Sequence, residues 1–310
     1  MRSYKKMMYF WDSKFTTMSQ QQTPKILVPT GFSEQSIKAA EQAAYFAKVM
    51  NAKLILLSVI ERDGFFARIF EDKEMSGKLR EKARTELKKL AESKSKEFGI
   101  EVETAVSEGV VYEEIAKAAE TLDVDLVVMG TNGKPGNIRQ RMIGSNAYRV
   151  VTLVQPPVVT IKGDAEISEI KNLVFPVMAD RKSREKTGMA MRIARLFNAH
   201  IHAVTFVTKD SEKEILVRQI RQLEKFITER GVSVSTEVIT PENRKPIAKL
   251  TIEYAQRIGG DMILITEEGE EPDLADMLLG SDVRDMLYYS DIPVMSVTPS
   301  PDKFKSVFER

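Results

Sequence analysis

A glycine-bearing segment that begins at residue 130 contains the residue types best suited to bind a phosphate. Gly130 and Gly133 are separated by two residues, and Gly144 and Ser145 follow after ten more. A strand that ends in a glycine-rich turn and opens a helix brings free backbone N–H groups and the positive end of the helix dipole to one place. Glycine is needed where a Cβ would block close approach of the backbone. This segment therefore predicts an anion site.

Neighbouring residues extend this prediction and also limit it. Lys134 and Arg139 add positive charge between the glycines. The structural alternative is that Gly130 and Gly133 only make a tight turn and Gly144 a close packing contact. Neither G-x-x-x-x-G-K-[S/T] nor G-x-G-x-x-G follows the first strand of the chain, so the signatures of two other classes of nucleotide site are missing. We identify no catalytic residue.

An internal repeat shows which elements must position this segment. The sequence KILVP at 25–29 returns as NLVFP at 172–176, which is a shift of 147 residues. DLVVMG at 125–130 returns as DMILIT at 261–266, and PVVTI at 157–161 as PVMSV at 293–297, each with a shift of 136. Such ordered, constant offsets indicate a duplication. We call residues 24–165 the first half and residues 166–310 the second half, and we expect the boundary between them near 162–168.

Each half alternates short apolar runs with helical patterns. In the first half the helical patterns cover 33–50, 73–98 and 112–122. Strands that alternate with helices imply right-handed crossovers and a parallel sheet covered on both faces. The prediction is an α/β fold of two tandem five-stranded, mainly parallel α/β sandwiches. Residues 1–23 lack a convincing period and are expected to form an N-terminal extension.

The composition excludes several classes of protein. The 310 residues include 46 basic and 45 acidic side chains, a balance that indicates no bulk attraction to nucleic acid or to a membrane. The absence of cysteine excludes disulfides and thiolate metal sites. No apolar run approaches the roughly 18 residues that span a bilayer. We expect a cytoplasmic protein that binds neither nucleic acid nor membrane.

The glycine spacing resembles the nucleotide motif of ATP-binding universal stress proteins, and the likeness covers nearly all of 24–299. It includes VPT at 28–30 and PPVV at 156–159. The resemblance implies an adenine nucleotide alpha hydrolase-like fold with ATP as ligand, with or without Mg²⁺. It implies phosphates on Gly130, Gly133, Gly144, Ser145 and the N–H of Asn146, ribose near Gly130 and adenine near Thr30 and Val59; Gly31, Met129 and Lys134 complete the candidate binding set. Valine at Gly130 or Gly144 is then expected to abolish binding while the domain stays folded.

At two places the sequence departs from the family pattern on which these site residues are based. The gap between Gly133 and Gly144 holds ten residues instead of nine. The aspartate that usually follows VPT is Gly31, which removes a carboxylate expected to contact the nucleoside. Both departures are expected to affect affinity or base selectivity.

The second half departs further at the equivalent positions. Thr266 replaces the first glycine, Met178 stands where the aspartate would be, and the segment 267–276 carries six carboxylates. Like charges near a polyphosphate oppose its binding. We expect a degenerate half without nucleotide and a solvated acidic loop, with a divalent cation site as the alternative. His200 and His202 are read as ordinary strand residues, so that no metal site is expected.

The resemblance predicts a regulatory, stress-response protein that senses an adenine nucleotide. A slow ATP hydrolase and a nucleotide-free scaffold for an unknown protein partner remain open as alternatives. In this family single domains dimerise through their last strands, so PVVTI and PVMSV are expected to pair within the chain as a pseudo-dimer. Further association into a homodimer is left open.

Overall fold

A computed structural model describes residues 23–61, 73–131, 145–162, 169–177, 183–243, 245–266 and 282–297. In the first half the strands are β1 (Lys25–Pro29), β2 (Lys53–Glu61), β3 (Val102–Gly109), β4 (Leu126–Thr131) and β5 (Val158–Lys162). The helices of this half are α2 (Glu34–Met50), α4 (Lys73–Phe98), α5 (Val111–Thr121) and α6 (Ser145–Leu153).

The second half repeats this order of elements. Its strands are β6 (Asn172–Pro176), β7 (His200–Phe206), β8 (Val234–Ile239), β9 (Met262–Thr266) and β10 (Val294–Val297). Its helices are α7 (Ser183–Phe197), the short 3-10 helix η3 (Asp210–Glu212), α8 (Lys213–Thr228), α9 (Ile247–Ile258) and α11 (Asp282–Tyr289).

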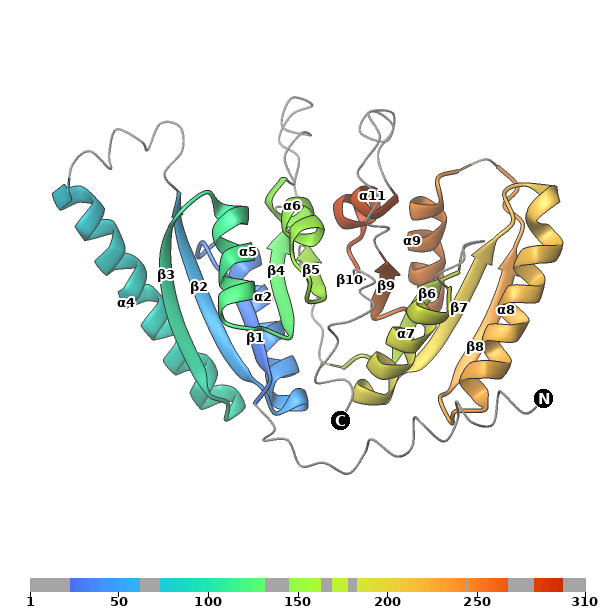
Figure 1. Ribbon diagram of the computed structural model, residues 1–310, viewed down its shortest axis with the longest axis horizontal. Coiled ribbons are helices and arrows are strands. Elements are labelled where there is room, and N and C mark those ends of the chain that lie inside the picture. The colour runs from blue at the N-terminus through green and yellow to red at the C-terminus, as the bar shows by residue number, and fades with distance from the viewer. Residues whose placement is uncertain are drawn as a thin grey trace, which may run out of the picture.

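All ten strands belong to one sheet with the order β3-β2-β1-β4-β5-β10-β9-β6-β7-β8 (Figure 1). Within each half neighbouring strands are parallel. The halves meet where β5 and β10 pair antiparallel, with Val159 opposite Met295. The predicted fold class and the pairing of the last strands are thus confirmed. In Figure 1, α6 and α11 lie side by side above this junction.

Short local signals set the ends of the helices. Ser33 caps α2, because its side chain accepts the N–H of Ser36 at 3.3 Å. Asn51 and Asn198 are equivalent positions of the repeat, and both adopt positive φ, 49° and 53°, just after α2 and α7. Asparagine tolerates this left-handed conformation, which ends a helix. The repeated Asn-Ala pair is therefore a helix stop that both halves kept.

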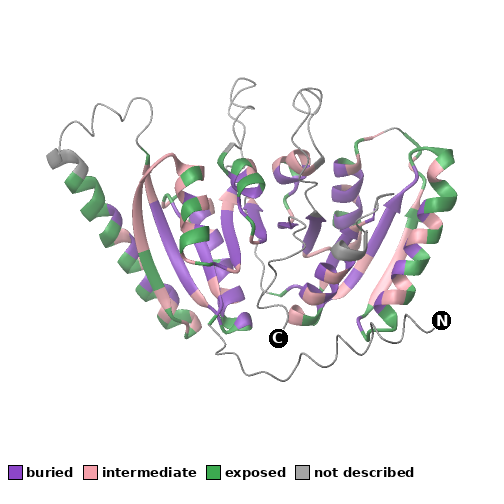
Figure 2. Ribbon diagram, in the orientation of Figure 1, coloured by how far each residue is buried: buried purple, intermediate pink, exposed green. Residues whose placement is uncertain are grey.

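Apolar side chains cover the sheet on both faces, and Figure 2 shows the inner strands mostly buried, whereas the edge strands β3 and β8 are largely of intermediate exposure. One core layer joins the strands to α2, α4, α7 and α8, and the other joins them to α5, α6, α9 and α11. Each layer continues across the junction; in the first of them, the rings of Phe46 and Phe197 lie 5.3 Å apart. Burial on both faces explains why the strands read as nearly continuous apolar runs.

The expected boundaries of the two halves lie outside the described residues and stay predictions. β5 ends at Lys162 and β6 begins at Asn172, while residues 163–168 lie outside the described part, as do residues 1–22 of the expected extension. No helix in the described ranges is both long and apolar enough to cross a membrane.

Candidate functional site

The first-half candidates converge at the carboxyl ends of three neighbouring strands. β1 lies between β2 and β4 and is parallel to both. Just after β1, the N–H of Thr30 donates to the carbonyl of Leu57 on β2 at 2.8 Å. Gly130, near the end of β4, faces the first turn of α2. The topology thus brings Thr30, Val59 and Gly130 to one edge of the sheet, where open α/β sheets bind ligands.

Thr30 holds the turn between β1 and α2. Its side chain is buried and its Oγ1 accepts the N–H of Phe32 at 3.2 Å, a residue with a φ of 61°. The same Oγ1 lies 3.2 Å from Oγ of Ser36, which donates to the carbonyl of Ser33 at 2.9 Å. A non-glycine residue at positive φ is strained and needs such support. Ser36, which was not among the candidate site residues, is part of this framework.

Gly31 leaves open space at the mouth of the site. The residue is exposed, and a Cβ built on it would meet no atom within 4 Å. The Cβ of an aspartate at this position would therefore meet no steric conflict. Its absence is a chemical change that the local backbone does not require.

Gly130 has a packing reason to be glycine. A Cβ at this position would lie 2.8 Å from the backbone carbon and oxygen of Gln35 and 3.1 Å from the backbone nitrogen of Ser36. Backbone atoms cannot move aside as a flexible side chain can, so a larger residue would push α2 away from β4. Valine at Gly130 is therefore expected to lower the stability of the domain as well as to block the site, and whether the domain stays folded remains a prediction.

Two other candidates lie in the core layer beneath α5 and α6. Met129 is only 5% exposed and packs in that layer, and Val59 is half-buried against it. Val111, the first residue of α5, packs against the same layer and was missed by sequence reasoning. Met129 therefore offers a ligand no exposed side chain, whereas Val59 stands at the edge of the layer.

The far end of the glycine motif coincides with a helix start. α6 begins at Ser145 and packs against β4 and β5, and Asn146 in its first turn is exposed. Gly133, Lys134 and Gly144, like the Ser145 side chain, lie outside the described residues, so their roles stay predictions. The motif nevertheless joins the carboxyl end of β4 to the N-terminus of a helix, as its spacing predicts.

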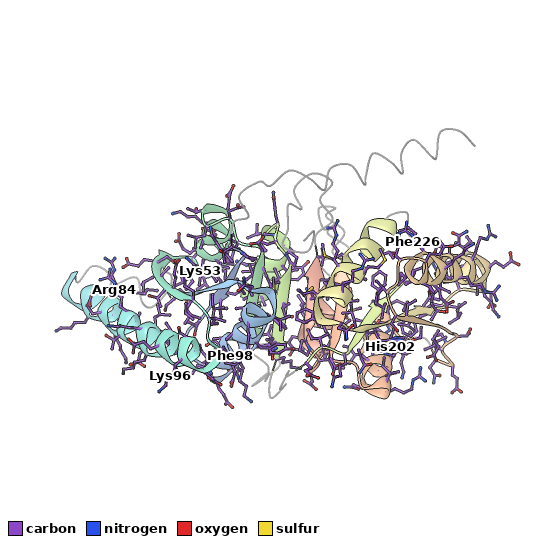
Figure 3. All side chains as sticks on the ribbon, turned by 90° about the horizontal axis from the view of Figure 1, so that it is seen from below. Lys53, Arg84, Lys96, Phe98, His202 and Phe226 are labelled. Carbon is purple, nitrogen blue, oxygen red and sulfur yellow. The ribbon has the colours of Figure 1, made fainter. Side chains whose placement is uncertain are left out.

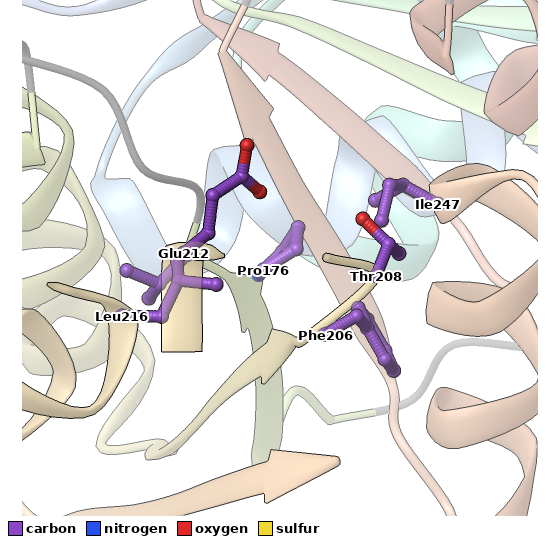
Figure 4. A pocket seen from close by; sticks show the side chains of 7 residues that line it. Pro176, Phe206, Thr208, Glu212, Leu216 and Ile247 are labelled. Carbon is purple, nitrogen blue, oxygen red and sulfur yellow. The ribbon is translucent and has the colours of Figure 1, made fainter. Parts of the chain in front are cut away.

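The equivalent edge of the second half holds an apolar cavity of about 110 Å³ (Figure 4). Val177 and Phe206 occupy the positions of Thr30 and Val59, and Ile247 that of Val111. All three line the cavity, together with Pro176, Thr208, Glu212 and Leu216. Residues 267–281, with the acidic run, lie outside the described residues, so the expected loss of nucleotide binding stays a prediction.

The two histidines form a polar network with strand neighbours. His200 contacts Oγ of Ser233 at 2.6 Å through Nδ1 and Oγ of Ser235 at 2.9 Å through Nε2, and His202 contacts Asn172 Oδ1 at 3.0 Å. Burial lowers the pKa of both rings, and the neighbouring His200 ring lowers the pKa of His202 further. In the described part of the chain no three metal-ligating side chains gather. The prediction that these histidines are ordinary strand residues fits this network.

Comparison with known proteins adds to these observations. The profile of the universal stress protein family matches residues 23–162. Over 140 residues the chain is 34% identical to universal stress protein MJ0531 of Methanocaldococcus jannaschii, spanning 44% of this chain and 81% of that protein. A solved universal stress protein from Archaeoglobus fulgidus matches 91% of this chain and 98% of its own, with a TM-score of 0.75 and 22% identity, and so shares the fold over both halves.

Two shorter solved universal stress proteins were determined with ligands. One is a complex with cAMP, which covers 43% of this chain and all of its own at 19% identity and a TM-score of 0.37. The other, from Archaeoglobus fulgidus, is a complex with dAMP and covers 41% of this chain and 97% of its own, at 18% identity and a TM-score of 0.33. The sequence match, the doubled fold and the repeat agree, and the chain belongs to the universal stress protein family as a tandem member.

Proposed function

We propose that the first half binds an adenine nucleotide, with ATP as the expected ligand, and that the protein acts as a regulatory sensor of it. The observation that carries the proposal is the link between β4 and α6. The glycine motif starts at Gly130 in β4, which ends at Thr131, and its last residue, Ser145, is the first residue of α6. Backbone N–H groups at such a helix start favour a phosphate.

The base would lie beside β1 and β2. Val59 and Val111 provide apolar surface at the edge of the core, and the exposed Gly31 leaves room for the nucleoside. Gly133, Gly144, Ser145 and the N–H of Asn146 would contact the phosphates, with Lys134 as a mobile counter-charge. The cAMP and dAMP complexes show that the family includes adenine-nucleotide binders; the proposal for this chain rests on its own residues.

A sensor fits this site better than a fast catalyst. Phosphoryl transfer requires a carboxylate to hold a metal ion and a group that orients the nucleophile. Gly31 offers neither at the end of β1, where the family pattern has aspartate. If Mg²⁺ accompanies ATP, the phosphate oxygens would provide most of its ligands. Phosphate release in single-turnover experiments separates a sensor, which releases none, from a slow hydrolase.

A nucleotide-free scaffold is the second candidate, and a specific observation favours it. Gly130 and Thr30 are both explained by the packing of α2 and the turn before it, without any ligand. Two of the motif residues thus give no independent support for a nucleotide.

Native mass spectrometry and calorimetry of the full chain test the proposal. We expect one ATP per chain, lost in Gly144→Val and retained in Gly280→Val, the equivalent change in the second half. Circular dichroism of both variants controls for folding. Two equivalent sites per chain would contradict the assignment to the first half, and no binding at all would favour the scaffold.

A further inference from the structure

The cavity of the second half lies where the sheet edge and two helix starts meet. Pro176 and Val177 at the end of β6 and Phe206 at the end of β7 contribute one side. Leu216 in the first turn of α8 and Ile247 at the start of α9 contribute others. Glu212 belongs to η3 and Thr208 lies just before it, so the described lining residues come from five elements and one loop, all in the second half.

The lining is apolar with two polar groups. Five lining side chains, those of Pro176, Val177, Phe206, Leu216 and Ile247, offer hydrocarbon surface, and Phe206 adds the flat face of its ring. The hydroxyl of Thr208 and the carboxylate of Glu212 stand on either side of Pro176 in the view of Figure 4. An apolar slot with a few convergent polar groups is the usual composition of a small-molecule site.

Volume and charge decide which ligand such a slot can hold. Its volume of about 110 Å³ is of the order of the engineered 150 Å³ cavity that admits benzene, so a single ring fits and a whole nucleotide does not. The carboxylate of Glu212, which lines the slot, opposes a phosphate there. The slot therefore excludes an anion and favours a neutral or positively charged ring.

Glu212 forms an ion pair with Lys209 that a bound cation can replace. Lys209 Nζ lies 3.3 Å from Glu212 Oε1, and the lysine side chain is 63% exposed. Exposed pairs of this kind contribute little stability, so a cation on a bound ligand can replace the ammonium at low cost.

We propose that the second half binds a small flat ring that carries an amino or amidinium group and no phosphate. The ring would lie against Phe206 and Ile247, and its N–H groups would donate to the Glu212 carboxylate and the Thr208 hydroxyl. This site goes beyond the nucleotide site of the first half, since it shares no residue with it and selects the opposite charge.

Benzamidine and benzoate are matched probes of this proposal, since both are six-membered rings of similar size with opposite charge. Titration of the full chain by ligand-detected NMR should show one benzamidine site and binding of benzoate at least about tenfold weaker. Glu212→Gln should weaken benzamidine binding by about ten-fold or more, because it removes a charge-assisted hydrogen bond. Equal affinity for the two probes would overturn the proposal.

A pair of cavity-filling changes locates the site. Ile247 is half-buried at the rim, so Ile247→Phe should fill the slot and abolish benzamidine binding while circular dichroism stays unchanged. Val111→Phe makes the equivalent change in the first half and should leave benzamidine binding intact. The reverse pattern, or binding that survives both changes, would refute the assignment. ATP binding measured on the same variants keeps this result separate from the nucleotide proposal.

Discussion

The two halves share one backbone plan and differ at the positions where we propose that a ligand binds. At the carboxyl edge of the sheet the first half places Thr30, Val59 and Val111, where the second half has Val177, Phe206 and Ile247. Each replacement is larger or more apolar, and all three line the cavity of the second half. The strands themselves stay apolar in both halves. The fold is therefore set by the strands and the ligand by the residues just beyond their ends.

The opposite edge of the sheet shows the same divergence. Lys53 at the start of β2 pairs with Glu101 at 2.7 Å and Glu103 at 2.8 Å. At the equivalent place in the second half, His200 contacts Ser233 and Ser235. Figure 3 shows Lys53 in the first half and His202, on the same strand as His200, in the second. An ion pair in one half is thus replaced by a neutral hydrogen-bond network in the other.

Among the changes that test this comparison of the two halves, we expect the largest effect at Gly130. Gly130→Val would force a branched side chain against the backbone of α2, and overpacking of this kind typically costs about 1–3 kcal/mol. We expect a lower midpoint of urea unfolding and the loss of ATP binding together. Thr266→Val is the equivalent change in the second half. It replaces one branched residue with another of similar size, so it should lower the unfolding midpoint less. An unchanged midpoint in Gly130→Val would show that α2 can move aside.

Restoring the missing carboxylate at position 31 is expected to strengthen ATP binding in the first half. Gly31→Asp fits without steric conflict and can accept hydrogen bonds from a nucleoside. A well-placed charge-assisted hydrogen bond contributes about 1.5–3 kcal/mol, or roughly ten- to a hundred-fold in affinity for ATP. Gly31→Asn, which has the same size and no charge, should gain less. Calorimetry that finds no tighter binding in Gly31→Asp would point to a pocket of another shape or to the scaffold.

The smallest expected effect is a dependence of the unfolding free energy on pH. It distinguishes the two halves, because both histidines of the chain lie in the second half. Their pKa is lowered by burial, with the other ring adding to this at His202 and Asp261 opposing it. The neutral rings therefore stabilise the fold above the unfolded pKa of about 6.5, and this stability is lost as the pH falls below that value. Lys53, whose pKa is raised to about 12, stays charged throughout this range.

Urea unfolding at about pH 5 and pH 8 checks this expectation, since the range spans the histidine titration. The double variant His200→Gln, His202→Gln should lose part of the pH dependence, and Lys53→Gln should retain it. A double variant with the same pH dependence as the parent would show that other groups cause it.

Much of the fold follows from the sequence because it depends on repeated, local signals. The apolar runs and the helical patterns mark elements whose bounds the structure reproduces within a few residues. The pairing of β5 with β10 was expected from the family resemblance and is confirmed, and the structure adds that it is antiparallel.

The site was less predictable, because its residues act through contacts between elements distant in sequence. In the sequence Gly130 resembles a turn glycine. In the structure a side chain at this position would clash with the backbone of Gln35, which lies in another element. The slot beside Phe206 was also missed, since its lining comes from Pro176 through Ile247 and has no motif. Only the placement of α8 and α9 against β6 and β7 creates it.

The junction of β5 and β10 also has a consequence for the behaviour of the protein in dilute solution. Thr160 Oγ1 donates to the carbonyl of Val294 across it at 3.2 Å, and Lys162 pairs with Asp291 at 3.2 Å. Because both strands belong to one chain, their association depends on an effective concentration fixed by the tether and not on how much protein is present. Two different halves therefore always occur in equal number and in contact. A dimer of separate chains would dissociate on dilution and could exchange partners, whereas this chain keeps one partner of each kind throughout its lifetime.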